Sequence, residues 1–231
     1  MGAGELARLH VITLAGPGDE VVAAVDEVLA AGAPLVQLRT KQGTDRARCR
    51  LAAEVVQRCH ATGARCLVND RADIAATVGA DGVHLGADDL AVAAVRILLG
   101  AEAVVGATCR DPESARRAEA EGATYLGVGP AFATSTKGGL PAPLGPAGVS
   151  RVAAAVDLPV IAIGGVTAER VAVLLEAGAH GVAVAGAVFA AADPSAATAA
   201  LLAALASLDR CGGENGTSTR RCDHENGGSR P

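Results

Sequence analysis

The sequence predicts a single-domain α/β protein with the fold of a (β/α)8 TIM barrel. Short apolar runs recur along most of the chain, and each is followed by a segment of helical length. A Gly-Ala pair precedes five of these runs, where a helix is expected to end and a strand to begin. Eight strand–helix units in about 200 residues indicate a (β/α)8 barrel, and an open doubly wound sheet is the alternative.

The predicted strands are short apolar runs that cover residues 9–14, 34–39, 66–68, 83–85, 104–107, 124–127, 159–163 and 181–184. The first helix ends at Gly32, as expected of a C-capping glycine, and Thr44 or Asp45 caps the second. Asp111 caps the helix after the fifth strand, with Pro112 at its first position. The helices are expected over residues 19–31, 45–60, 72–78, 187–192 and 195–208, with a further helix capped by Thr167.

Composition and charge exclude several kinds of partner. The chain has 231 residues, a net charge of −5, two Phe, one Tyr and no Trp. So few rings and a negative charge argue against nucleic acid and against an acidic membrane surface. No Cys-x-x-Cys pair, no signal peptide and no apolar run of ~20 residues occur, so we expect a cytoplasmic protein with reduced thiols and no membrane partner. The sequence leaves open whether it forms a homo-oligomer.

Two segments stand apart from the repeated units. Residues 128–147 form a connection rich in Gly and Pro on the expected functional rim, and its length is typical of a lid or binding loop. From Arg210 onward the chain has almost no apolar residues. We therefore expect the barrel domain to span residues 1–209 and residues 210–231 to form a disordered tail.

Carboxylates follow two neighbouring predicted strands. Asn69 and Asp70 come directly after the third strand, and Asp89 lies just beyond the fourth. Because ligands bind at the carboxyl ends of barrel strands, these side chains are expected on one rim. Two carboxylates without a nearby Cys or His pair suit a hard cation such as Mg²⁺. A single Asp at such a position more often caps the next helix, and only the shared rim favours a metal site.

Basic, amide and hydroxyl side chains are predicted on the same rim. They are Gln37, Arg39, Lys41, Thr108, Thr134, Thr136 and Lys137. Cations and carboxylates together suit a pyrophosphate bound with Mg²⁺, because the metal and the basic groups neutralise phosphate oxygens. The alternative without a functional role is that these are solvated loop residues and turn hydroxyls.

A second phosphate site is predicted after the seventh and eighth strands. Gly164-Gly165 and Ala185-Gly186 stand at helix starts there, where bare backbone N–H groups can face a phosphate. A tight turn is the alternative explanation of the glycine pair. The site thus suits small phosphorylated substrates, and without a nucleophile–base pair, stabilisation of a leaving group is favoured over covalent catalysis. His84 is expected to be a core or supporting residue, and Tyr125, Cys66 and Cys109 are expected to be core residues.

Five segments, in this order and spacing, resemble the thiamine phosphate synthase family. They are QLRTK (37–41), NDRADIA (69–75), GADGVHLGADDL (79–90), GVGPAFATSTK (127–137) and PVIAIGGVTAERV (159–171). The resemblance covers roughly residues 9–193. It implies a TIM barrel that requires Mg²⁺ and joins a hydroxymethylpyrimidine diphosphate to a thiazole phosphate, or to its carboxylated form, with release of pyrophosphate.

The resemblance also implies roles for individual residues. Asp70 and Asp89 would bind Mg²⁺. The pyrimidine diphosphate would be bound by Gln37, Leu38, Arg39, Thr40, Lys41, Asn69, Thr108 and Lys137. The thiazole phosphate would be bound by Thr134, Ser135, Thr136, Gly165, Ala185 and Gly186. The implied reaction is dissociative: pyrophosphate leaves with help from Mg²⁺ and the catalytic Lys137, and the thiazole nitrogen attacks the resulting pyrimidine-methyl cation.

Three positions depart from the usual family pattern. Thr108-Cys109-Arg110 stands in place of Ser-Thr-His, Ala87 in place of a common Gln, and Gly186 in place of a Ser. One lost hydrogen bond is worth roughly 1 kcal/mol, so weaker thiazole binding is expected rather than lost activity. Two other functions remain as alternatives: a related thiazole tautomerase, which would not need the groups for pyrophosphate, and a non-catalytic sensor of phosphorylated ligands.

Overall fold

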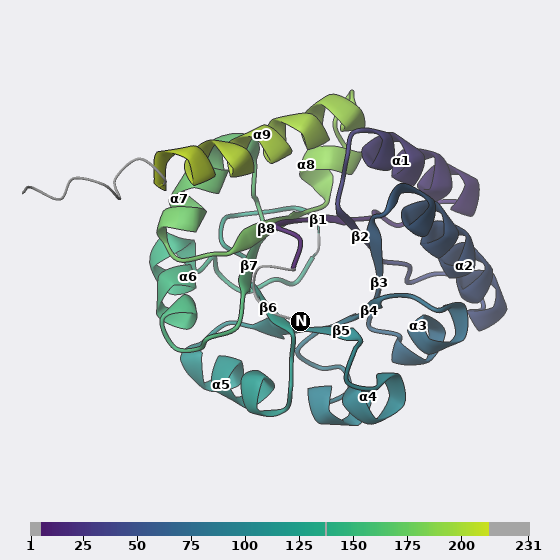
Figure 1. Ribbon diagram of the computed structural model, residues 1–231, viewed down its shortest axis with the longest axis horizontal. Coiled ribbons are helices and arrows are strands. Elements are labelled where there is room, and N and C mark those ends of the chain that lie inside the picture. Colours follow the sequence, from purple (N-terminus) through teal and green to yellow (C-terminus); the bar gives the residue numbers. More distant parts are fainter. Residues whose placement is uncertain (1–5, 137, 213–231) are drawn as a thin grey trace, which may run out of the picture.

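The computed structural model describes residues 6–136 and 138–212 of the chain. Eight parallel strands close into a barrel in sequence order (Figure 1). They are β1 Leu9–Ile12, β2 Leu35–Leu38, β3 Arg65–Asn69, β4 Gly82–Leu85, β5 Val104–Cys109, β6 Tyr125–Val128, β7 Val160–Ile163 and β8 Gly181–Val184. β1 and β8 close the ring, with Leu9 opposite Val182. The predicted barrel is confirmed, and the open sheet is excluded.

Helices surround the barrel (Figure 1). They are α1 Gly18–Ala30, α2 Asp45–Thr62, α3 Ala72–Val78, α4 Val92–Leu99, α5 Pro112–Ala120, α6 Gly145–Ala153, the 3-10 helix η2 Ala168–Arg170, α7 Val171–Glu176, α8 Gly186–Phe189 and α9 Pro194–Gly212. Two predicted caps are confirmed: the Thr44 hydroxyl accepts from the Ala47 N–H, and the Asp111 carboxylate accepts from the next helical turn. Within the described ranges, no helix has the length and hydrophobicity needed to cross a membrane.

Some boundaries differ from the prediction. β1 ends at Ile12, two residues before the predicted end. Thr167 stands at the start of η2, but its side chain makes no capping hydrogen bond. α9 continues beyond Leu208 to Gly212, since no helix breaker precedes that glycine. The part of the expected tail that follows, 213–231, lies outside the described residues.

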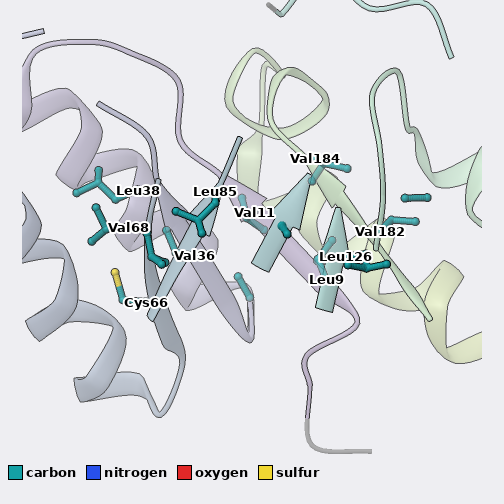
Figure 2. Packing of buried hydrophobic residues seen from close by; sticks show 14 of the residues in the cluster. Leu9, Val11, Val36, Leu38, Cys66, Val68, Leu85, Leu126, Val182 and Val184 are labelled. Carbon is teal, nitrogen blue, oxygen red and sulfur yellow. The ribbon is translucent and has the colours of Figure 1, made fainter. Parts of the chain in front are cut away.

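Side chains alternate along each strand between two packed layers. The outer layer lies between strands and helices, and in β2 and β3 it includes Val36, Leu38, Cys66 and Val68 (Figure 2). The inner layer fills the barrel with Leu6, Ile12, Leu35, Leu67, Val104, Tyr125, Ile161 and Ala183. Tyr125, Cys66 and Cys109 are buried, as predicted. At the carboxyl ends of β2, β3 and β5, the inward positions beyond this layer are Gln37, Asn69 and Thr108, so the polar rim begins where the apolar interior ends.

Candidate active site

A pair of amide side chains begins the polar rim. Gln37 is buried, and its Nε2 donates to Asn69 Oδ1 at 2.8 Å. This hydrogen bond uses the amide oxygen of Asn69 and leaves its NH2 group to donate to a ligand. β2 and β3 are neighbours in the barrel, and therefore the predicted proximity of the two residues is confirmed.

Asp70 and Asp89 lie side by side at the ends of β3 and β4. Partial burial raises the pKa of the Asp70 carboxyl, and the adjacent Asp89 carboxylate raises this pKa further. Lys41 offsets part of the repulsion, because its Nζ lies 3.5 Å from Asp70 Oδ2. Gly86 keeps the space beside the pair open: a Cβ there would lie 2.9 Å from Asp89 Oδ2 and 4.0 Å from Asp70 Oδ1.

Neither carboxylate caps the helix that follows it. Arg71 and Ala91 occupy the N-cap positions of α3 and α4, and neither side chain makes a capping hydrogen bond. Asp89 Oδ2 instead accepts from the Gly86 N–H at 2.6 Å. The helix-cap explanation of these residues is therefore wrong. Two adjacent carboxylates that repel each other fit Mg²⁺, which is commonly held by one or two carboxylates together with water and phosphate oxygens.

Two arginines hold the loops that carry these groups. Arg48 donates to the backbone carbonyl of Lys41 at 2.9 Å and fixes the β2–α2 loop. Arg71 donates to both carboxylate oxygens of Asp73, at 2.8 and 2.6 Å, and to Asp45 Oδ1 at 2.7 Å. These hydrogen bonds lower the pKa of both aspartates and tie the end of β3 to the start of α2.

A hydrogen-bonded chain of side chains runs from the barrel interior to the rim. Tyr125 Oη lies 2.9 Å from His84 Nδ1, and His84 Nε2 lies 3.0 Å from Thr108 Oγ1. Two glycines make room for the rings: a Cβ at Gly106 would overlap Tyr125, and one at Gly127 would lie 2.7 Å from His84 Cε1. His84 is thus a supporting residue, as predicted, and it orients the Thr108 hydroxyl.

The loop from residue 129 to residue 144 is attached to the end of β7. The Ala131 and Phe132 amides donate to the carbonyls of Ile163 and Gly164, at 2.7 and 2.9 Å. Gly165 has a positive φ of 63°, and a Cβ there would overlap the Ala133 carbonyl oxygen. The glycine pair therefore makes a tight turn, and this turn seats the loop directly against β7.

The same loop brings hydroxyl groups to the end of β8. Thr134 Oγ1 and Thr136 Oγ1 are hydrogen-bonded at 3.3 Å. A Cβ at Gly186 would lie 2.9 Å from Thr136 Oγ1, so this threonine lies directly over the β8–α8 turn. The loop thus contacts the turn after β7 through Ala133 and the turn after β8 through Thr136.

The remaining predicted site residues differ in their placement. The Leu38 side chain is buried in the outer layer, so only its backbone can serve a ligand at the rim. The Arg39 N–H donates to Thr13 Oγ1 at 2.9 Å, and the Thr40 hydroxyl donates to the Gln42 carbonyl at 3.3 Å. Ser135 is exposed and Ala185 is half-buried. Lys137 lies outside the described residues.

Together these features define a (β/α)8 barrel enzyme with a polar, carboxylate-bearing rim at the carboxyl ends of its strands. Residues 9–188 match the family described as thiamine monophosphate synthase, and the chain belongs to this family. It is a transferase of the thiamine-phosphate synthase type, a class that acts in thiamine biosynthesis.

Relatives with this description are similar over most of the chain. A thiamine-phosphate synthase from Salinispora arenicola is 53% identical over 203 residues, which cover 87% of this chain and 98% of the relative. One from Chlorobium luteolum is 45% identical and covers 78% and 85% of the two chains. The solved thiamine phosphate pyrophosphorylase from Pyrococcus furiosus superimposes with a TM-score of 0.78 at 32% identity, covering 87% of this chain and 96% of the other.

Proposed function

We propose that the chain joins 4-amino-2-methyl-5-hydroxymethylpyrimidine diphosphate to 4-methyl-5-(2-phosphoethyl)thiazole, giving thiamine phosphate and pyrophosphate. The carboxylated thiazole would react in the same way and would also release CO2. The observation that carries the proposal is the pairing of Asp70 and Asp89 beside Lys41, whose Nζ lies 3.5 Å from Asp70 Oδ2. Carboxylates and a lysine at one point suit a diphosphate bound together with a divalent cation.

The pyrimidine diphosphate is proposed to bind over β2, β3 and β5. Its ligands would be residues Gln37, Leu38, Arg39, Thr40, Lys41, Asn69 and Thr108, with Lys137. The contacts to Gln37 and His84 support this assignment, because they fix the Asn69 amide and the Thr108 hydroxyl before the substrate arrives. A fixed orientation of polar groups lowers the entropy that must be lost on reaching the reactive geometry.

Asp70 and Asp89 are proposed to hold Mg²⁺. When bound, the ion would neutralise diphosphate oxygens and so make pyrophosphate a better leaving group. The raised pKa of Asp70 supports this role, because a site with a repelling carboxylate pair gains most from a cation. Lys41 already supplies one positive charge there, and Lys137 is proposed to stabilise the departing pyrophosphate.

The thiazole phosphate is proposed to bind between the 129–144 loop and the ends of β7 and β8. Its ligands would be Thr134, Ser135, Thr136, Gly165, Ala185 and Gly186. Gly186 stands where a serine is usual in the family, so one hydroxyl is missing there. The Thr136 hydroxyl lies 2.9 Å from where a Cβ at position 186 would be. Thr136 can thus provide a hydroxyl donor where Gly186 has none.

In the proposed reaction the C–O bond of the diphosphate ester breaks, and its electron pair leaves with pyrophosphate. The thiazole nitrogen then donates its lone pair to the pyrimidine-methyl carbon and forms the new C–N bond. No side chain needs to form a covalent bond. The protein groups orient the two substrates, exclude alternative geometries and stabilise the negative charge of the leaving group.

The test is an assay of purified protein with Mg²⁺ and both substrates, together with the Lys137→Ala variant. We expect thiamine phosphate and pyrophosphate in equal amounts from the native protein and at least about 100-fold less from the variant, as expected when a charge that stabilises the leaving group is removed. Ser135→Ala serves as a control from the same loop, and it should change the affinity for the thiazole phosphate rather than the release of pyrophosphate.

Two results would contradict the proposal. Interconversion of thiazole isomers without pyrophosphate release would indicate a tautomerase. Tight binding of both ligands without turnover would indicate a sensor of phosphorylated ligands.

A further inference from the structure

Arg110 directly follows β5 and reaches across to the 129–144 loop. Its Nη1 donates to the Gly129 carbonyl at 2.7 Å, and its Nη2 donates to the Ala142 carbonyl at 2.9 Å. Gly129 begins the loop and Ala142 lies close to its end. A single guanidinium therefore joins the outgoing and returning arms of the loop to the barrel rim, one residue beyond the end of the strand that carries Thr108.

Backbone hydrogen bonds secure other parts of the loop. Leu144 and Gly145 donate to the carbonyls of Pro130 and Ala131, at 2.8 and 3.1 Å, and close the neck of the loop. The first arm is also held by β7, as described above. Ala142 lies beyond these contacts. Among the residues that the structure describes, Arg110 is the one side chain for which hydrogen bonds to both arms are found.

The chemistry of the guanidinium suits this role. It is planar and always charged, and its N–H groups form a rigid fork that can reach two carbonyls at once. A neutral imidazole has one N–H donor, so the histidine usual in the family at this position could not make both bonds. The charge of Arg110 is directed at backbone carbonyls, so its contribution to the site is to place the loop.

We propose that Arg110 is a positioning residue that clamps the 129–144 loop over the rim and so sets Thr134 and Thr136 against the ends of β7 and β8. Naming the thiazole phosphate as the substrate served by this clamp rests on the proposed function. The clamp itself does not, because it is a contact between the loop and the barrel that needs no ligand.

The first test follows hydrogen exchange of the ligand-free protein. Arg110→Met keeps an unbranched side chain but removes both donors. We expect exchange of the Ala142, Leu144 and Gly145 amides to rise about tenfold, the effect of roughly one net hydrogen bond. Arg116→Met, an exposed substitution on α5, is the control and should leave these amides unchanged. Unchanged exchange in Arg110→Met would overturn the clamp.

The second test separates binding from chemistry. In Arg110→Met the KM for the thiazole phosphate should rise about tenfold, while the KM for the pyrimidine diphosphate stays within about twofold. The loop carries three of the proposed thiazole ligands, whereas Lys137 is the one proposed pyrimidine-diphosphate ligand on it. Arg110→His should resemble Arg110→Met, and guanidinium ion should restore part of the affinity in Arg110→Ala. Equal rises in both KM values, without rescue by guanidinium, would overturn the positioning role.

The two tests also separate the clamp from the proposed function. If the native protein does not condense the two substrates, the proposed function fails. The exchange experiment then still decides whether Arg110 holds the loop.

Discussion

Asp70 combines an unusual backbone conformation with an unfavourable charge. Its φ is 64°, in the left-handed region that Asn and Asp tolerate better than other side chains with a Cβ. Its carboxylate is partly buried beside Asp89, which raises its pKa. Both features cost stability in the absence of a ligand. Strain and repulsion of this kind are typical of functional sites.

This combination predicts different outcomes for two substitutions of Asp70. Asp70→Asn keeps the tolerated backbone conformation and removes the repulsion, so stability should be unchanged or higher. Asp70→Ala should be about 1 kcal/mol less stable than Asp70→Asn, because alanine is disfavoured at this φ. Both should lose about 100-fold or more of Mg²⁺-dependent turnover if a metal ligand is removed.

Urea unfolding and steady-state rates measure the two effects separately. Turnover at the native rate in Asp70→Asn would show that Asp70 is not a ligand of the metal. An Asp70→Ala variant as stable as Asp70→Asn would show that the backbone conformation is not strained for alanine.

The environment of His10 predicts that the folded protein loses stability in acid. His10 is buried in the barrel, where its Nε2 lies 3.0 Å from the Ala7 carbonyl, and its Nδ1 has no hydrogen-bond partner among the residues that the structure describes. Burial, with smaller contributions from the nearby His84 and His180, lowers the pKa of His10 to about 3. Below pH 6.5 the His10 imidazole therefore binds a proton in the unfolded chain but not in the folded protein. The free energy of unfolding falls as the pH falls towards 3.

The expected loss from this residue is about 2 kcal/mol between pH 6.5 and pH 5. The measurement compares the free energy of unfolding of the native protein and of His10→Gln over that range, so that the other titrating groups cancel. The advantage of the native protein over the variant should shrink by this amount as the pH is lowered. Parallel curves would contradict the assignment.

At the scale of single residues, the sequence predicted the site residues that directly follow strands. Asn69, Asp70 and Asp89 were placed on one rim because the carboxyl ends of parallel strands meet there. The supporting contacts were not predictable. Arg48, Arg71 and Arg110 act through carbonyls and carboxylates that only the folded path of the loops brings near. In a sequence, an arginine that holds a loop looks the same as one that does not.

At the scale of elements, the turn after β7 determines where the 129–144 loop lies. Gly165 has a φ of 63° and lies against the Ala133 carbonyl, with no room for a Cβ. Gly79 has nearly the same φ, 67°, but a Cβ there would meet nothing within 4 Å. The two glycines therefore separate the cost of the backbone conformation from the cost of displacing the loop.

Gly79→Ala should cost about 1 kcal/mol of folding stability, the price of a positive φ alone. Gly165→Ala should cost more than this and should also raise the KM for the thiazole phosphate several-fold, because the loop must move. Thermal unfolding and steady-state kinetics provide the comparison. Equal stability losses with an unchanged KM in Gly165→Ala would show that the loop adapts without moving the site.

The sequence predicted elements well where local signals are strong. Thr44 and Asp111 cap their helices as expected, and α3 covers the predicted residues. Element ends were less predictable. The predicted end of the last helix was too early because composition changes gradually there, whereas the helix continues to the first glycine. The seating of the long loop on β7 could not be predicted, since it depends on backbone contacts between residues about thirty positions apart.

At the scale of the whole molecule, closure of the barrel brings together all the groups of the rim. The repeat of strand–helix units predicted eight strands, but the same repeat is compatible with an open sheet. What decides between them is the pairing of β1 with β8, a contact between the two ends of the repeat. The neighbouring strands β2, β3 and β4 set Gln37 and Asn69 beside the carboxylate pair, and closure brings the loop after β6 to the same rim.

The central claim is that Asp70 and Asp89 hold the cation that helps pyrophosphate to leave. Its most direct test is to measure single-turnover pyrophosphate release over a range of Mg²⁺ concentrations. Asp89→Asn is compared with Asp88→Asn, a matched change at the exposed neighbouring residue. We expect the Mg²⁺ concentration needed for half-maximal rate to rise at least about tenfold in Asp89→Asn, the effect of one lost ligand, and to stay at the native value in Asp88→Asn. The same Mg²⁺ dependence in all three proteins would contradict the claim.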